Sequence, residues 1–308
     1  MSTTPTANTA NTFSSPSLIR HLVLDNPMTL EATRVWRRFI RSGGDTGKGV
    51  NLTAICVLTV LYLWLLGAIL RYREDMTVGI LLLEVGLLTL IVPGSMYAAV
   101  SGERERMTWD GLIMTSLSPG QIVVGKLLWR VVLILGLAAL FVPPLLLCHY
   151  ATGLLGAERN MRDAYKLSEL FLAQGIIVTW GFLLAGFSLL VSTRTKRAVT
   201  TLAIVTITLL SFLVLVPMLV SLFGGDNGWR LTDAPLKQLG SLLQHLHPAI
   251  SFLEVLDGRD AVVYSPADLW RTNDWQRVIP WIYLSGAFAC TVGAWKTLKG
   301  LEEPRVRS

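Results

Sequence analysis

Between two long apolar runs, residues 101–126 read SGERERMTWDGLIMTSLSPGQIVVGK. The first half of this segment is charged, with the run 103–106 followed by Asp110, and a Ser118-Pro119 pair precedes a new helical pattern near Gln121. Charge beside a membrane-crossing segment has to lie in water or meet a partner. We therefore predict a surface element outside the bilayer, a short helix that another protein can push.

The flanking runs belong to a chain with a membrane composition. Of its 308 residues, 52% are hydrophobic and 16% are charged, whereas soluble domains carry about 25% charged residues. A membrane-crossing helix needs about 20 apolar residues. The composition thus predicts an all-α integral membrane protein with six transmembrane helices, within a transmembrane region 51–298. The stretches that meet this length are roughly 51–70, 78–100, 127–150, 170–192, 200–223 and 279–298.

Basic residues in short loops set the orientation of such a protein, because positively charged loops stay in the cytoplasm. The tight turn 193–197 reads TRTKR, and most other Lys and Arg residues precede the first span, join the second to the third, or follow the sixth. We therefore predict a multi-pass protein of the cytoplasmic (inner) membrane with both termini in the cytoplasm. Residues 224–278 are then an outer loop with interfacial or re-entrant helices, and 299–308 a cytoplasmic tail.

The N-terminal region divides into a polar tail, 1–25, which we predict to be disordered and cytoplasmic, and a segment 26–50 that contains an amphipathic helix and a glycine-rich turn. Residues 27–41 place apolar side chains on one side and arginines on the other, which is typical of a helix lying in an anionic headgroup region. Packing on a soluble partner is the alternative. The residues assigned to the membrane interface are Arg34, Trp36, Arg37, Arg38, Phe39 and Arg41.

Motifs for catalysis or cofactor binding are lacking. Residues 42–49, SGGDTGKG, place Ser42 where a phosphate-binding loop needs glycine and Gly49 where it needs Ser or Thr. The three cysteines stand alone in apolar runs, without metal-ligand spacing. No folded face gathers the charge that nucleic-acid binding requires. We predict that the chain is not an enzyme and holds no cofactor or metal.

Glu84 is the acidic residue inside the second predicted span. A carboxylate there costs a few kcal/mol unless it is paired or hydrated. One interpretation places it in the polar lining of a substrate cavity. The other makes it a protonated or hydrogen-bonded structural residue that faces a neighbouring helix, or one that reaches the outer interface.

The pattern in 101–126 carries a family resemblance. The matching residues are Glu103, Arg104, Glu105, Arg106, Thr108, Leu112, Ile113, Thr115, Ser116, Leu117, Ser118, Ile122, Val123, Gly125 and Lys126. This order of residues, with the layout of spans around it, resembles the intracellular loop of ABC type-2 transporter permeases. Three departures stand out: Met107 replaces the usual glycine before Thr108, Ser116 stands where proline is common, and Trp109-Asp110 replaces Leu-Glu.

The resemblance implies a permease subunit of an ATP-driven exporter that pairs with a second copy or a sister permease in the lipid bilayer. ATP and magnesium would bind a separate cytoplasmic ATPase subunit, which docks on a short coupling helix. The charges of 103–106 can form ion pairs across that interface, and Lys126 can extend to headgroups. The apolar side chains that can fill a groove on a partner are those of Leu112, Ile113, Met114 and Leu117. The predicted docking residues are Glu103, Arg104, Glu105, Arg106, Thr108, Leu112, Ile113, Leu117, Ser118, Gly125 and Lys126.

Two other functions are compatible with the residues. A membrane-anchored assembly protein would use the same loop to recruit a cytosolic partner without transport. A secondary transporter would show inverted repeats and charges near the membrane midplane, and Glu84 is the one residue here that fits this pattern.

Overall fold

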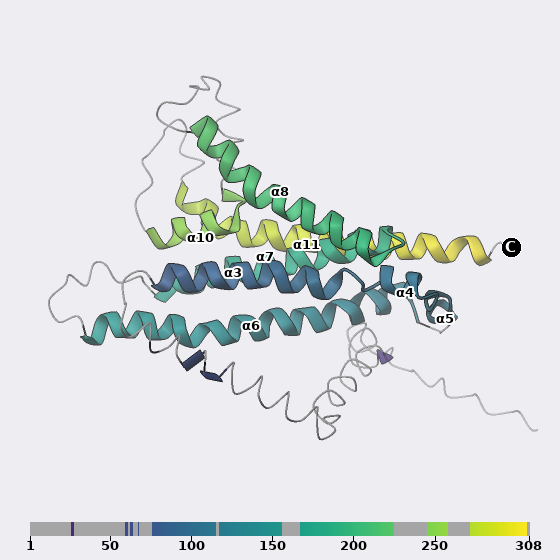
Figure 1. Ribbon diagram of the computed structural model, residues 1–308, viewed down its shortest axis with the longest axis horizontal. Helices are drawn as coiled ribbons and strands as arrows, with labels where there is room; N and C mark the ends of the chain where they lie inside the picture. The colour runs from purple at the N-terminus through teal and green to yellow at the C-terminus, as the bar shows by residue number, and fades with distance from the viewer. Residues whose placement is uncertain are drawn as a thin grey trace, which may run out of the picture.

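The computed structural model describes residues 26–27, 59–60, 62–63, 67, 76–114, 117–155, 167–224, 245–257 and 272–306. Within these ranges every regular element is a helix (Figure 1). The all-α prediction is therefore confirmed for this part of the chain. Only Pro27 of the predicted helix 27–41 is among the described residues. The residues predicted to lie at the membrane interface are therefore outside the described part: Arg34, Trp36, Arg37, Arg38, Phe39 and Arg41.

In the described part of the chain, five helices are long and apolar enough to cross a membrane. A helix suits lipid because it satisfies its own backbone N–H and C=O groups. The first predicted span, 51–70, falls mostly outside the described residues, so the count of six stays a prediction. The helix bounds are α3 Met76–Met96, α4 Ser101–Glu105, α5 Trp109–Ile113, α6 Pro119–Leu155, α7 Leu167–Arg194, α8 Ala198–Gly224, α10 Pro248–Asp257 and α11 Thr272–Val306.

Helix α6 begins earlier than the predicted third span, which started near residue 127. Ser118 and Gln121 form a capping box: the Gln121 backbone N–H donates to Ser118 Oγ at 3.3 Å, and the Ser118 N–H donates to Gln121 Oε1 at 2.9 Å. Pro119 then occupies the first helical position, where a missing N–H does no harm. The polar residues at the start of α6 are therefore helical, although a search for apolar stretches does not include them in the membrane span.

Helix α7 is the centre of the bundle, and α3, α6, α10 and α11 all pack on it. Of its most apolar stretch, 61% is buried, against 22% for α8. Trp180 on α7 stacks on Phe212 of α8 with ring centroids 5.7 Å apart, and lies 5.4 Å from the ring of Tyr283 on α11. Helix α10, within the predicted outer loop, adds the buried Phe252 to this core.

Two glycines on α7 permit close helix contacts. A Cβ built on Gly181 would lie 3.0 Å from a side-chain carbon of Ile134 on α6, and one on Gly186 would lie 2.9 Å from the backbone oxygen of Ala287 on α11. Small residues at helix contacts let the backbones of two helices approach closely. At Gly181 the neighbour is a side chain, whereas at Gly186 it is the backbone of α11.

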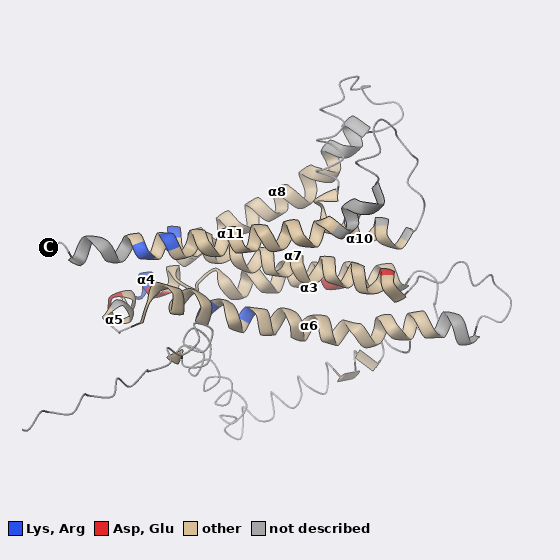
Figure 2. Cartoon of the chain, turned by 180° about the vertical axis from the view of Figure 1, so that it is seen from behind, with Lys and Arg blue, Asp and Glu red and all other residues tan. Residues whose placement is uncertain are grey.

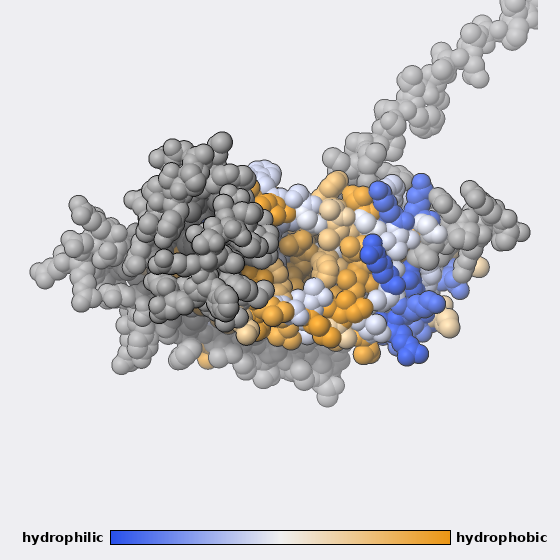
Figure 3. Space-filling view, turned by 90° about the horizontal axis from the view of Figure 1, so that it is seen from above, coloured by the Kyte–Doolittle hydropathy of each residue, from blue (hydrophilic) through white to orange (hydrophobic). Residues whose placement is uncertain are grey.

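Charge and apolar surface separate along the molecule. Helices α3, α6, α7 and α11 run side by side, while α8 diverges from them towards its C-terminal end (Figure 1). The charged residues of α4, α5 and the end of α11 gather at one end of the bundle (Figure 2). A top view shows apolar surface across the middle and hydrophilic surface at that end (Figure 3). Helices α4 and α5 therefore lie at the end of the bundle where the apolar surface of the long helices ends.

Candidate functional site

A cluster of buried hydroxyl groups attaches α4 to two other helices. The hydroxyl of Ser192 on α7 accepts hydrogen bonds from the backbone N–H groups of Val100 (3.0 Å) and Ser101 (3.1 Å), and donates to Tyr97 O at 3.0 Å. Thr201 on α8 donates to Ser101 Oγ at 2.9 Å. The first N–H groups of a helix have no partner within it, so Ser192 caps α4 from another helix.

Glu103 and Lys126 form an ion pair within the chain. Lys126 Nζ lies 2.6 Å from Glu103 Oε1 and also donates to the Ala99 carbonyl. The Lys126 side chain is only 11% exposed. The sequence had indicated that Lys126 reaches for lipid headgroups, and the structure corrects this: its ammonium points back into the protein and joins α6 to α4.

Arg104 and Glu105 also have partners inside the chain. The Arg104 guanidinium lies 5.3 Å from the ring centre of Trp109, in cation–π contact, and donates to Thr195 O at 3.4 Å. Glu105 Oε2 accepts from the backbone N–H of Ala198 at 3.0 Å, at the start of α8. A carboxylate is favourable there because it meets the positive end of the helix dipole.

These contacts change the interpretation of the charged run 103–106. The sequence had indicated four charges available to a partner protein. Glu103, Arg104 and Glu105 hold α4 against α6, the turn after α7 and the start of α8, and their docking to a partner protein stays a prediction. Arg106 is exposed, and no hydrogen bond or ion pair of its guanidinium is found among the described residues.

The apolar residues in α5 and on either side of it divide into a buried group and an exposed group. Trp109 is buried with Val100, Ile122 and Leu189, and Leu112 and Leu117 pack against this cluster. Trp109, Leu112 and Leu117 thus hold α5 to the bundle, and the docking of the two leucines in a groove of a partner stays a prediction. Met107 and Met114, at either end of α5, are 82% and 86% exposed. The side chain of Ile113, and both Thr115 and Ser116, lie outside the described residues.

The remaining predicted docking residues have local roles. Thr108 is exposed and donates through Oγ1 to Glu103 O at 3.1 Å, which closes the turn after α4. Ser118 caps α6 as described above, and Gly125 is buried within α6. Among these, Thr108 and Ser118 present accessible surface.

Met107 has a backbone φ of 57°, the one non-glycine residue with positive φ in the described part of the chain. This left-handed conformation brings Cβ close to the backbone and costs about 1–2 kcal/mol, except for glycine. The conformation explains why glycine is usual before the threonine in the resembling loops. In this chain a methionine takes that position despite the strain.

We predict that Lys126→Ala lowers the free energy of unfolding by about 1.5–3 kcal/mol, since it removes hydrogen bonds to a charged group and leaves Glu103 without its partner. Thermal unfolding in detergent measures this. Lys296→Ala, at an exposed site on α11, is the matched control and should change stability by less than about 0.5 kcal/mol. Restoration of stability by exchanging the two charges, in Glu103→Lys with Lys126→Glu, would support the pairing; equal stability of the two alanine variants would contradict it.

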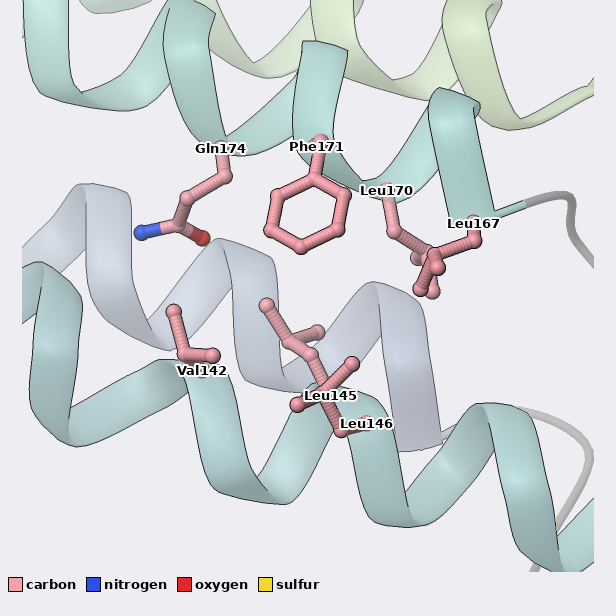
Figure 4. A pocket seen from close by; sticks show the side chains of 7 residues that line it. All are labelled: Val142, Leu145, Leu146, Leu167, Leu170, Phe171 and Gln174. Atoms are coloured by element: carbon pink, nitrogen blue, oxygen red, sulfur yellow. The ribbon is translucent and has the colours of Figure 1, made fainter.

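Glu84 lies inside the bundle, fully buried on α3. Its Oε1 accepts a hydrogen bond from Gln174 Nε2 of α7 at 2.5 Å. This geometry agrees with the structural interpretation, a hydrogen-bonded carboxyl group that faces a neighbouring helix. Gln174 also lines a small hollow between α6 and α7 (Figure 4). Gln174 is the polar residue in its lining, which otherwise consists of Val142, Leu145, Leu146, Leu167, Leu170 and Phe171.

We predict that Glu84→Ala destabilises the protein by about 1–3 kcal/mol, because it leaves the buried Gln174 amide without its acceptor. Glu84→Gln should lose less, since its amide oxygen can still accept from Gln174. Thermal melting of both variants distinguishes the cases. Equal losses would show that the hydrogen bond to Gln174 contributes nothing.

Sequence reasoning missed several residues of this end. Ser101, Ser192 and Thr201 are ordinary hydroxyl residues in their local sequence, and only packing brings them together. Ser118 and Gln121 did carry a signal, the Ser-x-x-Gln spacing of a capping box before an apolar run. Among the described residues, no group of His, Cys, Asp or Glu side chains is placed to hold a metal ion.

Comparison with known proteins identifies the family. The model of the family described as ABC-2 family transporter protein matches residues 72–295, more than two thirds of the 308 residues. The match spans α3 to α10 and most of α11, and so includes α4 and α5. None of the curated proteins compared with the chain matches it. The chain belongs to the ABC-2 transporter family, and it is a multi-pass membrane protein that serves as an ABC permease subunit.

Proposed function

We propose that this permease exports its substrate with energy from a separate ATPase subunit, which binds the α4–α5 element, residues 101–114, on the cytoplasmic side. The observation that carries the proposal is the attachment of α4 to three spans. Lys126 joins it to α6, Ser192 to α7, and Thr201 and Glu105 to α8. A force applied to this element therefore reaches the whole bundle.

The attachment of α4 to α8 indicates which helix would move when a force acts on α4. Helix α8 meets α4 near its N-terminal end and diverges from the bundle further along (Figure 1). A tilt of α4 would therefore swing the far part of α8 relative to α7. ATP binding and hydrolysis can drive this change only if the ATPase contacts α4–α5 differently in its two states.

The cytoplasmic location of α4–α5 has a direct test. Arg106→Cys, in a variant whose three native cysteines are replaced by alanine, places a thiol on the exposed turn. In intact cells or right-side-out vesicles, a membrane-impermeant maleimide should label this thiol only after the membrane is opened. Labelling from the outside of sealed vesicles would refute both the orientation and the ATPase docking.

The ATPase coupling is tested by co-expression of the full chain with the ABC ATPase subunits encoded in the same genome. We expect one of them to co-purify with the permease, and its ATP hydrolysis to change by several-fold when the permease is present. A permease that folds, reaches the membrane and binds none of them would instead support an anchoring protein or a secondary transporter.

A further inference from the structure

The outer side of the α4–α5 element differs chemically from what the sequence indicated. Glu103, Arg104 and Glu105 already have partners within the chain. The inward side of α5 is occupied by Trp109 and Leu112. The exposed side chains that remain are those of Arg106, Met107, Thr108, Asp110 and Met114, and the two methionines are the apolar ones among them.

Met107 stands out among them because its position disfavours any side chain. Its φ of 57° suits glycine, yet it carries a long apolar side chain that is 82% exposed. Packing inside the subunit cannot explain this choice, since the side chain is almost entirely in solvent. Residues held in strained backbone conformations cluster at functional sites.

Met114 supplies a second apolar group of the same kind. It is the residue at which α5 ends, and it is 86% exposed. Met107 and Met114 therefore bracket α5 on either side, while Trp109 and Leu112 anchor the helix from within. Methionine side chains are flexible and polarisable and adapt to irregular apolar surfaces, and Met and Arg are enriched in protein interfaces.

We propose that Met107 and Met114 are the anchors of the contact with the ATPase subunit, and that Arg106 pairs with an acidic group at its edge. The partner surface is accordingly an apolar groove with one acidic group opposite Arg106. A lipid surface fits less well, because anionic headgroups would present negative charge to the exposed Glu105 and Asp110 as well, whereas a protein can place its acidic group at Arg106 alone. This inference rests on the proposed function.

Met107→Gly gives a test in which stability and binding move in different directions. Glycine relieves the left-handed strain, so the melting temperature of the permease alone should be unchanged or higher. Removal of the side chain should weaken binding of the ATPase subunit. A purely structural residue would move stability without moving affinity.

The full measurement compares wild type, Met107→Gly, Met114→Ala and the double variant as full-length protein in nanodiscs, with the co-purified ATPase titrated by biolayer interferometry. The double variant should raise the Kd at least tenfold, equivalent to about 1.4 kcal/mol. Met107→Leu should bind nearly as wild type. Val199→Ala is the matched control, an exposed apolar residue in the first turn of α8, and should bind as wild type.

The possible outcomes distinguish a failure of the methionine anchors from a failure of the proposed function. If wild type binds an ATPase subunit and the double variant binds it equally well, the methionine anchors are refuted while the coupling function stands. If wild type itself binds none of the ATPase subunits, the proposed function fails and this inference fails with it.

Discussion

Gly186→Leu should abolish the folded bundle. A side chain at this position enters the backbone of α11, since even a Cβ would lie 2.9 Å from the Ala287 carbonyl oxygen and 3.3 Å from its Cα. Backbone atoms cannot rotate away as a side chain can, so α7 and α11 must separate. Overpacking of a core costs about 1–3 kcal/mol where side chains can adjust, and here the loss should be larger. We expect no monodisperse peak in detergent by fluorescence-detected size-exclusion chromatography.

The smaller substitution Gly186→Ala permits a graded comparison. It should lower the melting temperature, whereas Gly136→Ala should leave it unchanged or raise it slightly, because a Cβ at Gly136 of α6 meets nothing within 4 Å and alanine favours a helix over glycine. Both are glycine-to-alanine changes within membrane-spanning helices, so general effects of the substitution cancel. Equal melting temperatures of the two variants would contradict the close α7–α11 contact.

Ser192→Ala should detach α4 from α7. The substitution leaves the N–H groups of Val100 and Ser101 without an acceptor in a buried site. Each unsatisfied buried group costs about 1–3 kcal/mol, so we expect a loss of several kcal/mol and faster hydrogen exchange at 100–105. The ATPase activity that depends on the permease should fall together with the order of this segment.

Ser285→Ala is the control for this change. Its hydroxyl donates to Ile282 O within the same helix, at an exposed site on α11, so its loss should be within about 0.5 kcal/mol of wild type. If Ser192→Ala melted and exchanged like Ser285→Ala, α4 would not depend on its cap from α7, and the proposed transmission from α4 to the bundle would lose its main support.

The candidate site shows how far local patterns reach. The charge of 101–126 predicted an element outside the apolar shafts, and its pattern of residues led to the family that the comparison then established. The partners of those charges were not predictable. Glu103 meets Lys126, 23 residues away, and Glu105 meets Ala198, 93 residues away. Ionic side chains near a membrane surface have many possible partners, and which one is met depends on how the helices pack.

The starts of α6 and α4 likewise differ in whether the local sequence or the packing of distant helices determines them. The Ser118-x-x-Gln121 spacing encodes the start of α6 locally, because a capping box needs only four consecutive residues. The start of α4 has no such local cap, since its N–H groups bond to Ser192 on another helix. The local sequence of 97–105 therefore does not locate the start of α4.

Composition and hydrophobic length alone determined that this protein is helical and crosses the membrane, because lipid admits few other ways to satisfy a backbone. The resemblance of residues 101–126 to the intracellular loop of ABC type-2 permeases likewise sufficed to indicate its family. Tertiary structure decided which glycine lets α7 approach α11, and which side chains of the α4–α5 element face inward. Those outcomes depend on contacts between residues about 90 to 100 positions apart, such as Ser101 with Thr201 and Gly186 with Ala287, and no local pattern in the chain records them.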